Sequence, residues 1–136
     1  MAKRTIRNIP QDRAEMPVQE PQVRAGNFDE VALGFSLDNA LLEADRCLFC
    51  PKPKCIEACP VSINISGFIE KISDKDYRGA YDILTESTLL PAICGRVCPQ
   101  EDQCEGVCPV GVKYEPVAIG RLERWRSSNC HAQLVS

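Results

Sequence analysis

The chain has 136 residues, enough for one domain. Hydrophobic residues make up 44% of it, but nine of them are cysteines, so the conventional core formers are few and something else must reinforce the core. With 16 basic and 19 acidic side chains the net charge is −3, which argues against nucleic-acid binding through phosphates. No apolar run reaches the length of a membrane span, and no secretory signal follows the basic N-terminus. We therefore expect a cytoplasmic protein with reduced thiols and no membrane partner.

The first 27 residues lack periodicity, and prolines at positions 10, 17 and 21 interrupt them. We expect residues 1–27 to form an extended N-terminal arm that docks on another surface or stays mobile. The domain then covers residues 28–126, and a polar tail covers residues 127–136. Cys130 and His131 stand side by side in the tail, and nothing around them indicates a site.

Apolar spacing of i, i+3, i+4, i+7 predicts helices along the domain. Ser36, Asn64 and Asp76 stand where helix caps are expected. The predicted helices run from Leu37 to about Arg46, from Ile65 to about Ser73, from Tyr77 onward, briefly after Pro91, and from about Val117 to Arg126, with Pro116 in the first turn of the last. No strand pattern is present. The predicted fold class is therefore all-α, with two cysteine-rich loop regions.

Two groups of four cysteines dominate the sequence. They read Cys-x2-Cys-x4-Cys-x3-Cys-Pro at positions 47, 50, 55 and 59, and Cys-x3-Cys-x5-Cys-x3-Cys-Pro at positions 94, 98, 104 and 108. In bacterial ferredoxins three closely spaced cysteines bind one cluster and the Cys-Pro cysteine binds the other. By this logic one [4Fe–4S] cluster is bound by Cys47, Cys50 and Cys55. Cys59 crosses to a second cluster, and Cys108 returns as the fourth ligand of the first.

Structural zinc is the main alternative, because cysteines two to four residues apart also suit a tetrahedral ion. Zinc sites usually join two such pairs separated by roughly a dozen residues or more, whereas each group here gathers its four cysteines closely and ends in Cys-Pro. Disulfides are disfavoured in a reducing compartment. A thioredoxin-type Cys-x-x-Cys would need a βαβ unit that the sequence lacks. Iron–sulfur clusters are therefore the favoured interpretation.

The residues around the cysteines carry a family resemblance. The matching segments are Phe28-x-x-Val31-Ala32-Leu33-Gly34, Arg46-Cys47-Leu48-x-Cys50 through Cys59-Pro60-Val61, Ile65-x-Gly67-Phe68-Ile69, Cys94-Gly95-Arg96-Val97-Cys98-Pro99, Cys104-Glu105-Gly106-x-Cys108 and Ala118-Ile119-Gly120-x-Leu122-Glu123-Arg124. Over about residues 24–125 the chain resembles the N-terminal iron–sulfur domain of the glutamate synthase small (β) subunit, which is shared with dihydropyrimidine dehydrogenase and NADH-dependent ferredoxin:NADP oxidoreductase. The resemblance implies an α-helical ferredoxin-like domain whose cysteine-rich loops hold two [4Fe–4S] clusters.

Two clusters need eight ligands, and the two groups supply eight cysteines, so the simplest count closes without Cys130. The resemblance implies a different ligand set for the second cluster. In the family, the cysteine at the position of Cys94 is not a ligand. The second cluster is bound at the positions of Cys59, Cys98, Cys104 and Glu123, the last being an oxygen ligand on the final helix. The spacing allows this, because Glu123 follows Ile119 by four residues and shares its helix face. A solvated glutamate is the alternative, and Cys94 then remains the alternative fourth ligand.

In the family this domain precedes a region that binds FAD and NAD(P)H. The chain contains no Gly-x-Gly-x-x-Gly, so we expect both cofactors only in a missing C-terminal region or a partner. The expected function is electron transfer between that flavin/NAD(P)H-binding domain or subunit and a redox partner, such as the glutamate synthase large subunit or a ferredoxin-like protein. The chain would be a non-catalytic domain of an NAD(P)H-dependent oxidoreductase. The alternative is a structural domain for subunit assembly that binds zinc or no metal.

Residues next to the cysteines admit further interpretations. The basic residues among them either offset thiolate and cluster charge or are ordinary surface residues, namely Arg46, Lys52, Lys54 and Arg96. Gly95 and Gly106 are expected to let the backbone approach sulfur closely.

Overall fold

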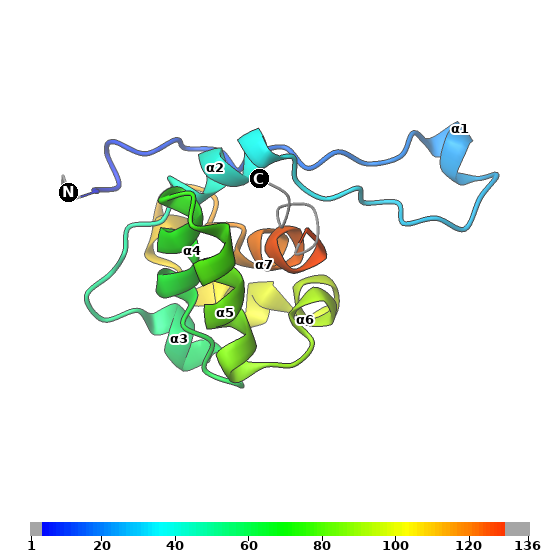
Figure 1. Cartoon of the computed structure of the whole chain (residues 1–136). Coiled ribbons are helices and arrows are strands. Elements are labelled where there is room, and N and C mark those ends of the chain that lie inside the picture. The colour runs from blue at the N-terminus through cyan, green and yellow to red at the C-terminus, as the bar shows by residue number, and fades with distance from the viewer. Residues whose placement is uncertain (1–3, 130–136) are drawn as a thin grey trace.

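The computed structural model describes residues 4–129, and in this range the chain is helical (Figure 1). The elements are α1 (Pro21–Arg24), α2 (Leu37–Ala44), α3 (Lys54–Ala58), α4 (Ile65–Ser73), α5 (Tyr77–Ser87), α6 (Pro91–Val97), the 3₁₀ turns η1 (Gln100–Asp102), η2 (Glu105–Val107) and η3 (Pro109–Val112), and α7 (Ile119–Ser128). No strand forms among these residues, so the prediction of an all-α chain is confirmed for them. None of these helices combines the length and the apolar character that crossing a bilayer requires.

Three helices begin at the caps that the sequence predicts. The Ser36 hydroxyl accepts a hydrogen bond from the backbone N–H three residues later, at the start of α2. Asn64 does the same for α4, and Asp76 does so for α5. Each side chain satisfies a backbone donor that the first helical turn leaves without an acceptor. These three starts are therefore determined by local sequence.

The last helix begins later than predicted. α7 starts at Ile119, whereas the sequence pattern predicted a start near Val117. Two distant carboxylates hold the backbone at this point. Glu43 Oε1 accepts from the N–H of Ala118 at 2.8 Å, and Glu105 Oε1 accepts from the N–H of the second residue of α7 at 3.1 Å. Tertiary acceptors thus supply the partners that the first turn of α7 needs.

The core lies where two helix pairs meet. α4 packs against α5, α6 packs against α7, and α7 also contacts α2 and α5. Side chains with no exposed surface fill the space between them, namely Phe68, Ile69, Ile72, Ala80, Leu84 and Leu122. Tyr77 of α5 meets Trp125 of α7 edge to face, with ring centroids 5.6 Å apart. α7 therefore joins the α4–α5 hairpin to the cysteine-rich half of the chain.

The N-terminal segment docks on the body in one part and projects from it in another (Figure 1). The docked part is fastened by Arg46, whose side chain is 1% exposed and pairs with Glu43 at 2.7 Å. The Arg46 guanidinium also donates to the backbone carbonyls of Pro10, Gln11, Glu115 and Pro116. Arg46 is therefore not a surface residue, and its hydrogen bonds go to backbone oxygens and a carboxylate.

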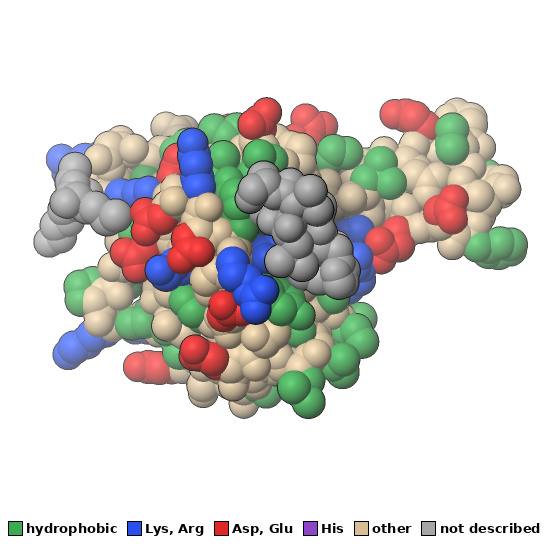
Figure 2. Space-filling view, viewed as in Figure 1, with side chains coloured by type: hydrophobic (Ala, Val, Ile, Leu, Met, Phe, Trp, Pro, Cys, Tyr) green, Lys and Arg blue, Asp and Glu red, His purple; other side chains and the backbone are tan. Residues whose placement is uncertain are grey.

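Residues 17–33 form the projecting part and carry α1. Its two sides are joined by backbone hydrogen bonds from Gln19 to Val31 and from Leu33 to Pro17, each 2.8 Å long. Phe28 near its tip is fully exposed. On the face that Figure 2 shows, acidic and basic side chains are interspersed, with hydrophobic side chains between them.

Candidate metal centres

Four predicted ligands line one small cavity, which we call the first cysteine site. These ligands are Cys47, Cys50, Cys55 and Cys108. The first three belong to the loop before α3 and to α3 itself, whereas Cys108 lies between η2 and η3. Much of the remaining lining is apolar, from Ile65, Ile69, Val117 and Ile119, and Lys54 lies at the same cavity. The structure thus brings Cys108 to the first group of cysteines.

The thiols of this site are held in a desolvated environment. Burial raises the pKa of Cys47 to about 12 and that of Cys55 to about 11, and neighbouring cysteines add to both increases. Desolvation disfavours a charged thiolate. Without metal these two thiols are therefore protonated at neutral pH, and a metal that binds them must displace their protons. Four thiols that line one largely apolar cavity suit a cluster that accepts sulfur ligands.

The other predicted ligands gather at a second location, which we call the second cysteine site: Cys59, Cys98, Cys104 and Glu123. Burial is the largest cause of the raised pKa of Cys98 and of Cys104, where the value is about 12, and the charges of Cys59 and Glu123 raise both further. The four groups are therefore electrostatic neighbours. They come from the end of α3, the end of α6, the residue before η2, and α7.

Glu123 is buried rather than solvated. Its side chain belongs to a residue that is 7% exposed, and its Oε1 has no hydrogen-bond partner among the described residues. Burial raises the pKa of the Glu123 carboxyl to about 7. A buried polar atom without a partner costs free energy, which a metal ligand bond would offset. Glu123 therefore fits an oxygen ligand at the second cysteine site.

Cys94 lies beside the same site. Its Sγ is 3.7 Å from the Thr88 hydroxyl oxygen. The charge of Cys94 and a hydrogen bond with it also raise the pKa of the Cys98 thiol. All eight cysteines in residues 4–129 are free thiols. Within this range no three Cys, His, Asp or Glu side chains converge on a point that a single metal ion would occupy. Cys130 and His131, for which the sequence indicated no site, lie outside the described residues.

The glycines between the cysteines lie against the backbone of neighbouring elements. A Cβ on Gly95 would lie 2.6 Å from the backbone nitrogen of Arg124 and 2.8 Å from the carbonyl oxygen of Gly120. A Cβ on Gly106 would meet the carbonyl oxygen of Glu101. Gly95 therefore lets α6 approach α7 closely. This contact fixes Cys98, at the end of α6, relative to α7 and its Glu123.

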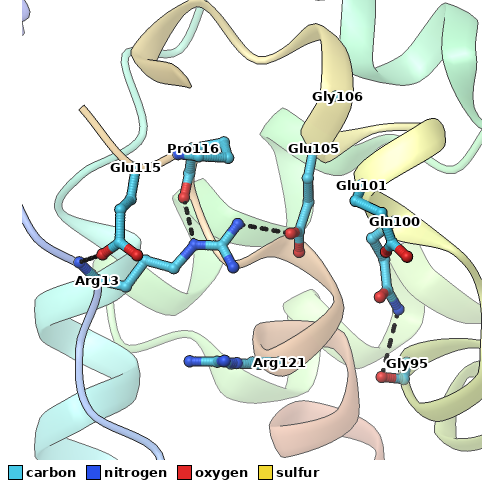
Figure 3. A pocket seen from close by; sticks show the side chains of 9 residues that line it. All are labelled: Arg13, Gly95, Gln100, Glu101, Glu105, Gly106, Glu115, Pro116 and Arg121. Atoms are coloured by element: carbon cyan, nitrogen blue, oxygen red, sulfur yellow. Dashed lines mark hydrogen bonds and ion pairs between the residues drawn. The ribbon is translucent and has the colours of Figure 1, made fainter. Parts of the chain in front are cut away.

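Sequence reasoning missed the charged residues beside the second cysteine site (Figure 3). A pocket of about 470 Å³ lies there, lined in part by Arg13, Gln100, Glu101, Glu105 and Arg121. Arg13 Nη2 lies 2.6 Å from Glu105 Oε2. The position of Glu105 directly after Cys104 was an available signal, whereas nothing in the sequence links Arg13 to this loop. Arg96, which also lies next to a cysteine group, forms an ion pair with Glu30, an exposed residue in the projecting part of the N-terminal segment.

Several known proteins are similar to this chain in sequence. Residues 24–134 match the family described as dihydropyrimidine dehydrogenase domain II, 4Fe-4S cluster. The chain is 33% identical over 125 residues to the glutamate synthase [NADPH] small chain of Escherichia coli strain K12, covering 92% of the chain and 26% of that protein. It is 37% identical over 98 residues to PreT of the same strain, an NAD-dependent dihydropyrimidine dehydrogenase subunit, covering 72% of the chain and 24% of PreT.

A glutamate synthase [NADPH] small chain from Halomonas elongata is 32% identical over 117 residues, covering 85% of the chain and 25% of that protein. The chain thus spans about a quarter of the length of these curated relatives. The family match includes both cysteine groups and Glu123, so the resemblance to the iron–sulfur domain of the glutamate synthase small subunit and of dihydropyrimidine dehydrogenase is confirmed. The chain belongs to the 4Fe-4S family of dihydropyrimidine dehydrogenase domain II, an iron–sulfur electron-transfer domain of oxidoreductases of these two types.

Proposed function

We propose that the chain is an electron-transfer module with an α-helical ferredoxin-like fold and two [4Fe–4S] clusters. When bound, each cluster takes up and releases single electrons. The proposal rests on one observation above all. The eight predicted ligands fall into two sets of four, and each set draws on both cysteine-rich segments.

The first cluster would be bound by Cys47, Cys50, Cys55 and Cys108. Its support is the shared cavity, whose walls are largely apolar. Exclusion of water and the hydrogen bonds to sulfur are two of the means by which a protein adjusts a cluster's potential. Lys54 at the cavity supplies a positive charge near the thiolates.

The second cluster would be bound by Cys59, Cys98, Cys104 and Glu123. Its support is the buried Glu123 oxygen without a hydrogen-bond partner, close to Cys98 and Cys104. One carboxylate in place of a thiolate changes the ligand field and the hydrogen bonding around the cluster, so the two clusters would differ in potential. Cys94 would be a neighbour of this cluster rather than its ligand.

The electron partner would be a flavin and NAD(P)H-binding region, either on the same polypeptide or in another subunit. The support is the nucleotide for which the relatives are named, NADPH for the glutamate synthase small chain and NAD for PreT, together with the three-quarters of their length that this chain does not match. The second redox partner would be of the glutamate synthase large-subunit or ferredoxin type. Residues 28–126 would form the cluster-binding domain between the arm (1–27) and the tail (127–136). Reduced thiols would place the protein in the cytoplasm.

The test is metal and sulfide analysis of the full chain, purified without oxygen. Two clusters predict about eight iron atoms and about eight acid-labile sulfides per chain. Reduced samples should show electron paramagnetic resonance (EPR) signals from two distinct clusters. One zinc ion or more per folded chain, or a folded chain with neither metal, would instead favour the structural assembly domain.

A further inference from the structure

Arg13 and Glu105 form an ion pair (Figure 3), and each of them makes a further hydrogen bond to the protein. Arg13 Nη2 and Glu105 Oε2 are 2.6 Å apart, and their side chains are only 19% and 9% exposed. Arg13 Nε also donates to the carbonyl oxygen of Pro116 at 2.7 Å, and its backbone N–H donates to Glu115 Oε2 at 3.0 Å. The second oxygen of Glu105 accepts from the N–H of Gly120 at 3.1 Å. Each member of the pair thus has a hydrogen-bond partner besides the other member.

The pair lies next to a proposed ligand of the second cluster. Glu105 follows Cys104 directly in the chain, and both residues are 8% exposed. Charges act more strongly where water is excluded. The charge of this carboxylate therefore reaches the cluster that Cys104 would bind.

We propose that Glu105 and Arg13 set the reduction potential of the second cluster, Glu105 by lowering it and Arg13 by raising it. The inference rests on the proposed function, because it requires Cys104 to be a ligand. The two residues are positioning residues and not ligands. Through Arg13, the N-terminal segment, which lies outside both cysteine groups, would help to set the potential of the second cluster.

The signs follow from electrostatics. Reduction adds one negative charge to the cluster, so a nearby carboxylate opposes reduction and lowers the potential. The Arg13 guanidinium offsets this carboxylate. Loss of Arg13 should therefore lower the potential, and loss of the Glu105 charge should raise it. If the ion pair had only a structural role, loss of Arg13 and loss of the Glu105 charge would shift the potential in the same direction, because each breaks the same contact.

The experiment is a potentiometric titration of the full chain without oxygen, with EPR reporting each cluster separately. Arg13→Gln should lower the midpoint potential of the second cluster, and Glu105→Gln should raise it. The double variant should return close to wild type, and so should Arg13→Lys, which keeps the charge. We expect a threefold to tenfold change in the ratio of reduced to oxidised cluster at fixed potential, where tenfold corresponds to about 59 mV for one electron.

Two controls separate charge from structure. Asn39→Ala removes the hydrogen bond from Asn39 to the Glu15 carbonyl, 2.8 Å long, and so loosens the N-terminal segment without changing charge. It should leave both potentials unchanged. The first cluster in the same molecule is the internal reference.

The outcomes distinguish this inference from the proposed function. A wild-type chain with one cluster would contradict both. Two clusters in the wild type, with Arg13→Gln and Glu105→Gln shifting the second potential in the same direction or not at all, would overturn this inference alone. If Glu105→Gln loses the cluster, the comparison of Arg13→Gln with Arg13→Lys decides, because equal potentials in these two variants would exclude a role of the charge.

Discussion

Glu123 is a residue whose surroundings argue for a ligand. A glutamate on a helix is ordinarily solvated, and an isolated buried carboxylate is disfavoured because desolvation costs free energy. Glu123 is nevertheless 7% exposed, with Oε1 unpartnered in the described part of the chain. Iron at the second cysteine site would provide the missing partner. Since Glu123 lies on α7, the core helix that contacts α2, α5 and α6, its backbone is well fixed.

Replacing this side chain tests its role directly. Glu123→Ala should remove the oxygen ligand and lower the iron content from about eight toward about four per chain, with loss of the second cluster's EPR signal. Glu123→Gln keeps an oxygen donor and should retain more of that cluster. Glu57→Ala, at an exposed position of α3, is the matched control and should change neither. Full iron content with an unchanged spectrum in Glu123→Ala would instead point to Cys94 as the ligand.

Among the helices, the contact between α6 and α7 depends on glycine. Gly95 faces the backbone of α7, which has no flexible end that could move aside. Cys94, which precedes it in the chain, lies beside the second cysteine site, and Cys98, which directly follows α6, belongs to that site. A change in the distance between the helices would therefore reach the ligands as well as the core.

Gly95→Ala should lower stability although alanine is the better helix former. Helix propensity favours alanine by about 1 kcal/mol. Overpacking against the α7 backbone opposes it, and such strain costs about 1–3 kcal/mol or more. We expect a net fall in the thermal unfolding midpoint, measured by circular dichroism on the cluster-loaded chain, and a changed EPR spectrum of the second cluster. Gly26→Ala, whose Cβ would meet only Val23 O at 3.7 Å, is the control. Equal midpoints for the two variants would refute the packing argument.

Over the full chain, the two proposed clusters act as crosslinks between segments that are far apart in sequence. Cys108 belongs to the second cysteine group but lines the cavity of the first. Cys59 belongs to the first group but neighbours Cys98 and Cys104. Binding free energy for each cluster would therefore also be folding free energy, which suits a chain with few conventional core residues.

Cys108→Ser tests this crossover. It should perturb the spectrum of the first cluster and lower the thermal unfolding midpoint, while the second cluster is retained. Cys94→Ser, in the same cysteine group, should leave the iron content unchanged, because Cys94 would not be a ligand. A Cys108→Ser variant in which only the second cluster responds would show that the crossover assignment is wrong. Iron analysis, EPR and circular dichroism on the same anaerobic samples provide the comparison.

Patterns among residues close together in the sequence were sufficient to predict several features of this protein. Three helix starts were predicted from the caps at Ser36, Asn64 and Asp76 and from the spacing of the apolar residues that follow each cap. Each start depends on residues within one or two helical turns. The cysteine spacing identified the class of metal site for the same reason, since tight loops bring neighbouring thiols together. Family resemblance, rather than periodicity, pointed to Glu123.

Other features depended on contacts between distant residues. The start of α7 is set in part by Glu43, 75 positions before its partner Ala118, and Arg13 reaches Glu105 across 92 positions. Arg46 could not be recognised as a buried fastening of the N-terminal segment, because its acceptors are backbone carbonyls, which every residue carries. A local pattern reveals that a donor or a charge exists, but the partner is chosen only when packing excludes water and leaves one acceptor within reach.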